Sequence, residues 1–254
     1  MSVPELSVVV PVHNEAENIG PLLDEVRRAL GEIVAFEIVV VDDKSDDDTL
    51  ARLDTCVRSM SELRIICHAR NAGQSTALHT GVQFARAPLV ATLDGDGQND
   101  PADIPRLLAH YREAADRQSL LIVGQRTSRR DTRVTRISSW IANAVRRYFL
   151  QDRTPDAGGA PKLFGRDLFL ALPYFEHMHR FLPALVLRAG GRVLSLPVNH
   201  RPRARGRSHY GIHDRLWTGI VDMLGVAWLL RRSRLAHAVE HTKLEVTPRQ
   251  ARRV

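Results

Sequence analysis

The chain has 254 residues, of which 44% are hydrophobic, so it is long enough to bury one sizeable α/β core. Its two cysteines, Cys56 and Cys67, are too few for a disulfide framework and match no zinc-ligand spacing, which excludes disulfide-stapled and zinc-finger domains. The net charge of +7 is unevenly placed, because residues 1–125 carry 11 Lys and Arg against 20 Asp and Glu, whereas residues 126–254 carry 25 against 9. The basic second half favours an anionic partner: a phosphate, a nucleic acid or an acidic membrane surface.

The first half of the chain alternates short apolar runs with helical patterns. We expect strands at Leu6–Val12, Phe36–Asp42, Leu63–Cys67, Leu89–Leu93 and Leu120–Val123, and helices at about Ala16–Leu30, Thr49–Met60, Gly73–Ala85 and Ala102–Ala115. The strands show little apolar–polar alternation, as expected for strands covered on both faces. This order of elements predicts βαβ units and therefore a three-layer, Rossmann-like α/β/α sandwich around a mostly parallel sheet.

The pattern becomes irregular after Arg126. We expect a helix at Arg133–Leu150, a Gly-rich loop at Asp156–Pro161, a strand at Val193–Asn199, a basic run over residues 201–210 and a helix at Asp214–Arg232. These elements suggest one α/β domain over residues 1–212, an amphipathic helix within residues 213–238 and a polar tail over residues 239–254.

The last helix has two interpretations. Its apolar residues, among them Trp217, Leu224 and Trp228, recur near helical spacing and are flanked by arginines, which is typical of a helix lying on a membrane surface and equally of one packed on a core. No segment has the basic and apolar regions of a signal peptide, and none reaches the ~18 apolar residues needed to span a bilayer. We therefore expect a cytoplasmic protein without a signal peptide or transmembrane helix, peripheral on the cytoplasmic face of a membrane, with a separate membrane partner as a further possibility.

Polar clusters follow four of the expected strands. They are His13-Asn-Glu15, Asp42-Asp43, Asn71-Ala-Gly73 and Asp94-Gly-Asp96. In a doubly wound sheet, ligands bind beyond the carboxyl ends of the strands. The sequence thus predicts that these clusters meet at one rim.

The segment Asp94-Gly-Asp-Gly-Gln98 places two carboxylates and an amide oxygen in one short turn. Hard oxygen ligands of this kind suit Mg²⁺ or Mn²⁺, so we expect Asp94, Asp96 and Gln98 to hold such an ion. A divalent ion there would offset the charge that develops as a nucleoside diphosphate departs. The alternative is a turn that merely caps the helix after Pro101.

The run Asp42-Asp43-Lys-Ser-Asp-Asp-Asp-Thr49 offers carboxylates to a ribose or base edge. We expect Asp42, and with it Asp43, to contact a nucleotide. One of the three residues 46–48 is expected to cap the following helix instead.

Together these segments resemble family 2 glycosyltransferases of the GT-A fold. The resemblance rests on Pro11-Val-His-Asn-Glu-Ala-Glu-Asn18, Val41–Thr49, Asn71-Ala-Gly-Gln-Ser-Thr-Ala77 with Gly81, and Leu93-Asp-Gly-Asp-Gly-Gln98 with Pro101, and it covers roughly residues 5–210. It is closest to the dolichol-phosphate mannosyltransferase-like and polyprenyl-phosphate glycosyltransferase branch. The resemblance implies that a nucleotide is bound by Pro11, Asn14, Glu15, Asp42, Asp43, Gly73 and Gln74. His13 departs from the family, which usually has an aromatic residue there.

The basic half also resembles that branch. The matching features are Gly124-Gln-Arg126, a basic helix containing Arg136 and Ser139, and Arg203-Ala-Arg-Gly-Arg-Ser208, with His209 in place of the usual lysine. By resemblance, the acceptor phosphate would be held by Arg126, Arg136, Ser139, Arg203, Arg205 and Ser208. A lipid phosphate is already an anion and needs no general base to activate it, whereas cationic positioning by arginine forks suits it well.

The leading interpretation is a metal-dependent, inverting transfer of a sugar from a GDP- or UDP-sugar to a polyprenyl phosphate, with Asp94, Asp96 and Arg126 as its catalytic residues. One alternative is transfer to a saccharide or protein hydroxyl, for which Asp156 would be the base. Another is a nucleotide- or nucleic-acid-binding module. We do not expect nucleic acid as a partner, because the basic half contains no recognised nucleic-acid-binding motif.

Overall fold

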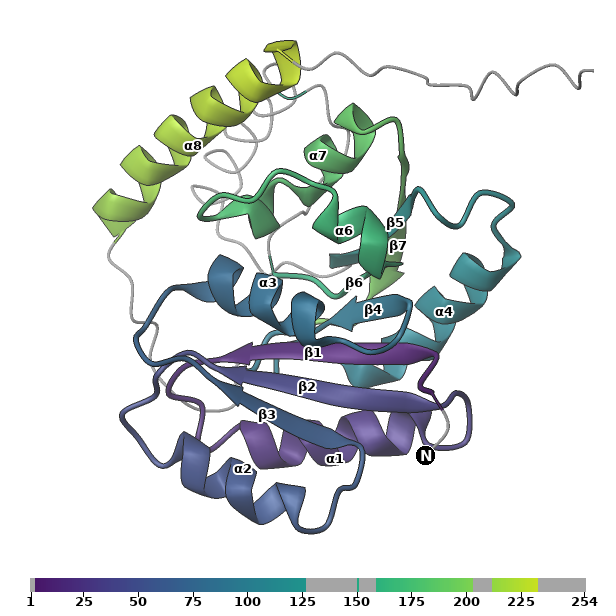
Figure 1. Ribbon diagram of the computed structural model, residues 1–254, viewed down its shortest axis with the longest axis vertical. Coiled ribbons are helices and arrows are strands. Elements are labelled where there is room, and N and C mark those ends of the chain that lie inside the picture. The colour runs from purple at the N-terminus through teal and green to yellow at the C-terminus, as the bar shows by residue number, and fades with distance from the viewer. Residues whose placement is uncertain (1–2, 127–149, 151–158, 203–211, 233–254) are drawn as a thin grey trace, which may run out of the picture.

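The computed structural model describes residues 3–126, 150, 159–202 and 212–232, which are coloured in Figure 1. Its strands are β1 (Leu6–Val12), β2 (Phe36–Asp42), β3 (Leu63–Cys67), β4 (Leu89–Thr92), β5 (Leu120–Arg126), β6 (Lys162–Gly165) and β7 (Arg192–Val198). Its helices are α1 (Ile19–Leu30), α2 (Thr49–Val57), α3 (Gln74–Phe84), α4 (Ile104–Glu113), α6 (Arg166–Leu170), α7 (Leu182–Arg188) and α8 (Ile212–Arg232), with 3₁₀ turns η1 (Pro101–Asp103) and η2 (Met178–Arg180).

The seven strands form one sheet in the order β3-β2-β1-β4-β6-β5-β7. The pairs β1–β2, β1–β4, β2–β3 and β5–β7 are parallel, whereas β6 runs antiparallel to both of its neighbours, β4 and β5. The prediction of an α/β fold with a mostly parallel sheet is therefore confirmed.

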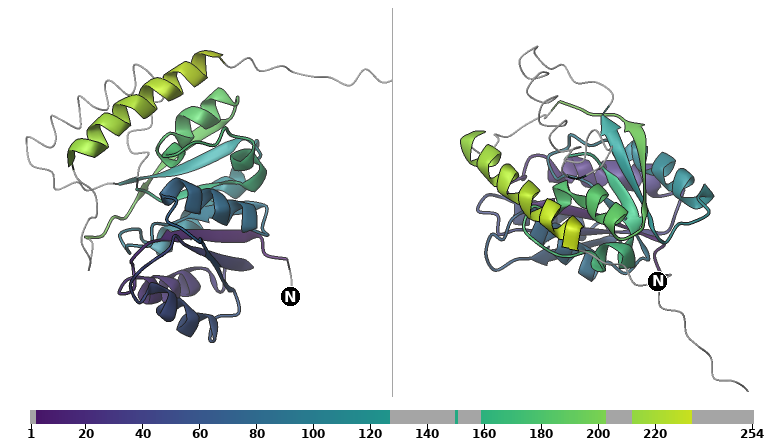
Figure 2. Two further views of the ribbon diagram at one scale, coloured as in Figure 1. Left: turned by 60° about the vertical axis from the view of Figure 1, so that its left-hand side comes forward. Right: turned by 90° about the horizontal axis from the view of Figure 1, so that it is seen from above.

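The central strands of the sheet bury side chains on both faces, whereas the edge strands β3 and β7 are largely half-buried or exposed. On β1, Val8 and Val10 join the core that includes residues of α1 and α4, whereas Val9 joins the core that includes residues of α3 and α7. Successive side chains of a strand point to opposite faces, so a strand covered on both sides must be apolar throughout. The helices on either side of the sheet are visible in the turned views of Figure 2.

The sequence missed β6. This strand is short, and it begins with Lys162, which is buried. Because a buried lysine is rare and the strand's place depends on pairing with two distant strands, no local pattern indicates it. A smaller difference concerns β5, which continues beyond the expected Val123, so that Arg126 is its last residue and does not follow it.

Helix α8 packs on the core along one side. Val226 and Ala227 are buried there, and Figures 1 and 2 show α8 as an outer helix at the α7 end of the molecule. Val221, Leu224 and Trp228 are exposed. The helix thus has a buried apolar side and an exposed apolar side, and core packing alone does not account for its composition. The expected division into residues 1–212, 213–238 and 239–254 stays a prediction.

The expected helix at Arg133–Leu150 lies outside the described residues except for Leu150, which is buried. Within the part of the chain that the structure describes, no helix is both long and apolar enough to cross a membrane.

Candidate active site

The acidic turn Asp94–Gln98 follows β4 and lies against the end of β1. A β-carbon added to Gly95 would lie 2.6 Å from Val12 Cγ1 and 3.2 Å from the Pro11 carbonyl oxygen. Glycine at this position therefore allows the turn to approach the β1 backbone closely. Gly97 has φ = 72°, a left-handed conformation that also favours glycine. The turn accordingly meets the two strand ends predicted to form the rim.

Hydrogen bonds with Gln74 and Asn99 fix the position of Asp94. The Gln74 amide nitrogen donates to Asp94 Oδ1 at 2.9 Å, and the Asp94 backbone N–H donates to Asn99 Oδ1 at 3.1 Å. Asn99 in turn donates to the Gly159 carbonyl oxygen at 2.8 Å. Gly159 itself leaves little room for a side chain, since an added β-carbon would lie 3.2 Å from Asp94 Oδ2 and 4.0 Å from Arg126 Nη1. Asp94 and Arg126 therefore face the same point beside Gly159.

The charges around Asp94 oppose one another. The pKa of Asp94 is raised to about 6, chiefly by burial and also by the Asp96 carboxylate, against the opposing effects of Lys162, Arg126 and the hydrogen bond from Gln74. Two close carboxylates disfavour each other's ionisation, and a nearby cation relieves that cost. The site thus combines two carboxylates with two basic side chains.

A divalent ion fits this arrangement. No group of three or more His, Cys, Asp and Glu side chains within the described ranges is placed to hold a metal. Mg²⁺ sites in phosphate-transferring enzymes characteristically take one or two carboxylates and complete their shell with water and substrate phosphates. Asp94 and Asp96 match that pattern, and the electrostatic cost of placing them together is one that a cation would offset.

Gln98 lies beside the start of the basic run. Its backbone N–H donates to Asp96 Oδ1 at 3.1 Å, and its backbone oxygen accepts from the Arg201 N–H at 3.0 Å. The Gln98 amide nitrogen faces the Arg201 carbonyl oxygen at 3.5 Å. The Arg201 guanidinium pairs with Glu25 and Asp100, each at 2.6 Å, and so anchors the run structurally. A metal-binding role for Gln98 stays a prediction.

The carboxylates after β2 are largely engaged by backbone. Asp43 is buried, and its two oxygens accept from the N–H groups of Ala72 and Gly73 at 2.9 and 2.7 Å, with His68 Nδ1 2.7 Å away. Asp42 accepts from the Ser45 hydroxyl at 2.5 Å. These bonds shape the loops at the rim. The structure therefore gives Asp43 a scaffolding position next to the predicted nucleotide residue Gly73.

Asn14 joins the loops after β1 and β2. Its N–H donates to the Ser45 hydroxyl at 3.0 Å, and its Oδ1 accepts from the Asp46 N–H at 2.9 Å. The backbone of Asn14 has φ = 58°, a conformation that asparagine tolerates better than most residues. Next to it, the buried Nδ1 of His13 has no hydrogen-bond partner within the described residues, which is the kind of atom a ligand would satisfy.

Glu15 is tied to the start of α2. Its N–H donates to Thr49 Oγ1 at 2.9 Å, and its carboxylate accepts from the Asn18 amide at 2.7 Å. The N-cap residue of α2 is Asp48, whose side chain makes no capping hydrogen bond, whereas the preceding Asp47 accepts from the Thr49 N–H at 2.9 Å. The same contacts explain why α1 begins at Ile19 and not at the expected Ala16.

Sequence reasoning missed two groups near Asp94. Lys162 lies directly opposite Thr92 of β4, and its amine donates to the Ala160 carbonyl oxygen at 3.1 Å. His179 is buried, and its Nδ1 lies 2.7 Å from the Ser75 hydroxyl. One signal pointed to Lys162: the chain has three lysines among its 36 basic residues, so an isolated lysine in an arginine-rich sequence is conspicuous.

Several predicted residues lie outside the described residues. They are Arg136, Ser139, Asp156, Arg203, Arg205 and Ser208. The predicted residues that the structure describes lie at the ends of β1, β2 and β5, around the turn after β4 and at the start of α3, and their binding roles stay predictions. They are Pro11, Asn14, Glu15, Asp42, Asp43, Gly73, Gln74, Asp94, Asp96, Gln98 and Arg126.

Comparison with known proteins identifies the family. Residues 7–172 match the family described as Glycosyl transferase family 2. The chain belongs to this family.

Two curated relatives carry polyprenyl-phosphate names. A dodecaprenyl-phosphate galacturonate synthase from Rhizobium johnstonii is 37% identical over 89% of this chain and 68% of its own length. An undecaprenyl-phosphate 4-deoxy-4-formamido-L-arabinose transferase from Edwardsiella ictaluri is 32% identical over 82% of this chain. The chain spans 63% of that relative's length, so it matches part of a longer protein.

Solved structures place this family 2 glycosyltransferase in the GT-A fold. The mannosyltransferase PcManGT from Pyrobaculum calidifontis, in complex with GDP-Man and Mn²⁺, has a TM-score of 0.66 at 21% identity and covers 93% of this chain and 67% of its own. Glucosyl-3-phosphoglycerate synthase from Mycobacterium tuberculosis, in complex with Mn²⁺, UDP and phosphoglyceric acid, has a TM-score of 0.65 at 20% identity and covers 89% of this chain and 78% of its own. The predictions of a GT-A fold and of a glycosyltransferase are confirmed, and the alternative of a nucleic-acid-binding module is not supported.

Proposed function

We propose that this glycosyltransferase moves a sugar from a nucleoside-diphosphate sugar to a polyprenyl phosphate. The observation that carries the proposal is the convergence of the Asp94 carboxylate and the Arg126 guanidinium on one point beside Gly159. A carboxylate that holds a metal would serve the diphosphate of the donor, because the metal binds phosphate oxygens. An arginine beside that carboxylate is suited to bind a second, separate phosphate. The names of the relatives support a polyprenyl-phosphate acceptor.

On the donor side, Asp94, Asp96 and Gln98 would hold Mg²⁺ or Mn²⁺. The metal would act as a Lewis acid toward the departing diphosphate. Pro11, Asn14, Glu15 and Asp42 would contact the nucleotide, while Asp43 would shape the loop that contains Gly73. Structural neighbours crystallised with Mn²⁺ and UDP or GDP-Man support a donor of this class, although GDP and UDP remain equally good proposals for this chain.

On the acceptor side, Arg126 would orient the lipid phosphate, helped by Arg136, Ser139, Arg203, Arg205 and Ser208. Arg201 is hydrogen-bonded to the acidic turn, and Arg203 is two residues away, within ~7 Å of extended chain. The phosphate oxygen would attack the anomeric carbon without surrendering a proton, giving inversion in a single displacement. The Arg126 guanidinium would replace part of the water that otherwise solvates the attacking phosphate.

The test is a transfer assay with radiolabelled UDP- and GDP-sugars, Mn²⁺ and a short-chain polyprenyl phosphate. We expect label in the lipid phase with one donor. Asp156→Asn separates the alternative acceptor class, because transfer to a hydroxyl needs a base and would be abolished by this change. Transfer to a saccharide or protein with none to polyprenyl phosphate would overturn the proposal.

The raised pKa of Asp94 predicts how metal binding depends on pH. With a pKa of about 6, Asp94 is ionised above pH 6 and protonated below it, so protons compete with the metal on the acid side. The affinity for Mn²⁺ is expected to be constant above pH 7 and to fall by up to ~10-fold per pH unit below about 6. Calorimetric titration with Mn²⁺ between pH 5 and 8 measures this, and an affinity unchanged between pH 7.5 and pH 5 would contradict it.

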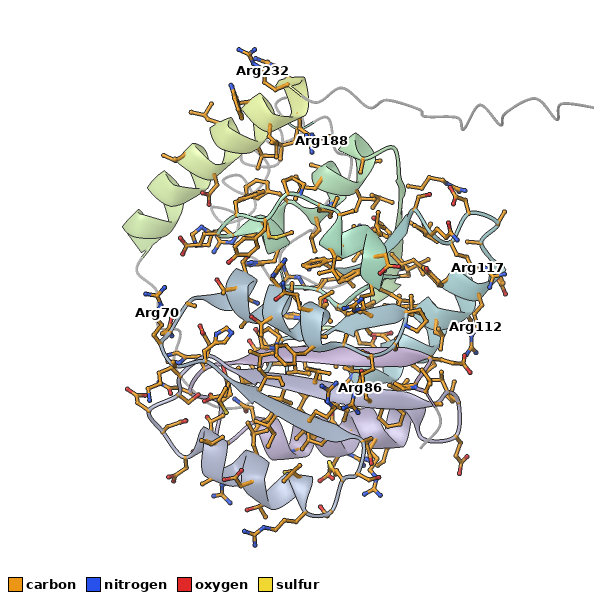
Figure 3. The ribbon with its side chains drawn as sticks, in the orientation of Figure 1. Arg70, Arg86, Arg112, Arg117, Arg188 and Arg232 are labelled. Carbon is orange, nitrogen blue, oxygen red and sulfur yellow. The ribbon has the colours of Figure 1, made fainter. Side chains whose placement is uncertain are left out.

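We propose that the exposed side of α8 contacts a membrane. Val221, Leu224 and Trp228 are 52%, 52% and 61% exposed, and their spacing places them on one side of the helix. The exposed Arg231 and Arg232 follow, and Figure 3 shows Arg232 at the same end of the molecule as Arg188. An apolar strip beside arginines is suited to an anionic lipid surface.

Combined Leu224→Ser and Trp228→Ser substitution is expected to lower binding to vesicles that contain phosphatidylglycerol by ~10-fold or more, because the apolar area that enters the interface is lost. Co-sedimentation measures the bound fraction. The matched control is Leu50→Ser on α2, a side chain 40% exposed, which should bind like the wild type. Equal binding by the double variant and the wild type would exclude this surface.

A further inference from the structure

A buried polar pair joins the start of α3 to η2. Ser75 and His179 are 2% and 7% exposed, and they are separated by 104 positions in the sequence. The Ser75 hydroxyl lies 2.7 Å from His179 Nδ1, and the His179 backbone N–H donates to the same Ser75 oxygen at 3.3 Å. Two hydrogen bonds therefore connect these residues in the middle of a packed layer.

His179 is neutral in the physiological range. Burial, together with the charges of Lys162, Arg180 and His177, lowers its pKa to about 3. Ser75 Oγ accepts from the His179 backbone N–H, and its hydroxyl hydrogen can still be donated to a neutral ring nitrogen. In the tautomer with its proton on Nε2, the His179 ring accepts that hydrogen at Nδ1.

The Ser75–His179 pair lies next in sequence to Gln74, which donates a hydrogen bond to the predicted metal ligand Asp94. Gln74 directly precedes Ser75 and is the first residue of α3, and its amide donates to Asp94 Oδ1 at 2.9 Å. On its other side, Gly73 has φ = 86° and its N–H is bound by Asp43. Gln74 therefore lies between two anchored neighbours, and its amide is directed at one Asp94 oxygen while the other oxygen faces Gly159.

We propose that His179 is a positioning residue of this enzyme, acting through Ser75 and Gln74 to fix the orientation of the Asp94 carboxylate. The proposal rests on the proposed function, in which Asp94 holds the metal. Partners that orient a ligating carboxylate typically alter metal affinity by ~10–100-fold when removed. His179 touches neither donor nor acceptor in this scheme, and its effect is on the geometry of the metal site.

The test compares His179→Ala, His179→Asn and His179→Gln by electron paramagnetic resonance titration with Mn²⁺ alone, without donor or acceptor. The asparagine Oδ1 falls near the position of Nδ1 and accepts the Ser75 hydrogen, whereas the glutamine oxygen falls near Nε2. We expect the Kd for Mn²⁺ to rise ~10-fold or more in His179→Ala and His179→Gln and to recover in His179→Asn. The exposed His110→Ala serves as the matched control and should bind as the wild type does.

A double-mutant cycle with Gln74→Ala tests the route of the effect. If His179 acts through Gln74, then His179→Ala adds nothing to the Kd of a Gln74→Ala protein. Ser75→Ala removes the same side-chain hydrogen bond with little change in volume, and it should raise the Kd for Mn²⁺ to a similar extent. It therefore provides the test if His179→Ala folds poorly. Wild-type Kd values in both Ser75→Ala and His179→Ala, or fully additive effects with Gln74→Ala, would overturn the inference. Absence of Mn²⁺ binding by the wild type would instead refute the proposed metal dependence, and the inference with it.

Discussion

Asp96→Ala is expected to lower the rate of sugar transfer by ~10²–10³-fold, with little change in folding. Asp94 and Asp96 are the two carboxylates of the acidic turn, and removing one leaves too few protein ligands to hold the ion against a departing diphosphate. At ~1.4 kcal/mol per tenfold, this loss corresponds to about 3–4 kcal/mol of transition-state stabilisation. The measurement is kcat/KM for the nucleotide sugar in the polyprenyl-phosphate assay at saturating Mn²⁺.

Two controls make this result specific. Asp24→Ala removes an exposed carboxylate from α1 and should leave turnover unchanged. Thermal unfolding without metal should give similar midpoints for Asp96→Ala and the wild type, whereas Mn²⁺ with UDP or GDP should stabilise the wild type alone. Turnover by Asp96→Ala equal to that of the wild type would remove the basis for assigning the metal to this turn.

Gly81→Ala is expected to lower the free energy of unfolding by about 1–3 kcal/mol through overpacking. Gly81 lies on the side of α3 that packs against the sheet, where an added β-carbon would lie 2.3 Å from Val9 Cγ1 and 3.2 Å from Val41 Cγ2. Val9 and Val41 are fully buried, so they have little room to move. Helix propensity alone favours alanine by up to ~1 kcal/mol, so the sign of the change reports the packing.

Gly20→Ala in α1 is the matched control for Gly81→Ala. A β-carbon there meets no atom within 4 Å, so this change should raise stability by a few tenths to ~1 kcal/mol. Urea unfolding of both variants, followed by circular dichroism, gives the two values. A stabilising Gly81→Ala would show that α3 does not pack on β1 as closely as described.

Much of the fold could be predicted because parallel core strands appear in the sequence as short apolar runs. The bounds of β1, β2 and β3 agree with the expected ranges, since each is a short, largely apolar run, and β1 and β2 are buried on both faces. The strand β6 has no such signal, because its place depends on pairing with β4 and β5 far away in the sequence. Local patterns carry no information about such pairings.

The candidate site was predictable in position but less so in the role of each residue. The topology of the sheet explains why the polar residues after the strands lie together at one rim. Whether a carboxylate faces a ligand or a backbone N–H depends on contacts between loops, such as the bonds from Ala72 and Gly73 to Asp43. For the same reason His179 was missed, because its partner Ser75 lies more than 100 positions away.

The reversed strand β6 has a consequence for how this enzyme can diversify. Because β5 and β6 are antiparallel neighbours, the chain leaves the sheet after Arg126 and re-enters it at Lys162 on the same rim, beside Asp94. The length of the intervening segment can therefore change without altering the order of the strands, while Gly159 near its end keeps its hydrogen bond from Asn99 beside the acidic turn. Under the proposed function, in which Arg136 and Ser139 of this segment hold the acceptor phosphate, selection for a new acceptor would act here while the residues proposed to bind the donor stay constant. The two specificities would then be separable in evolution and in engineered chimeras.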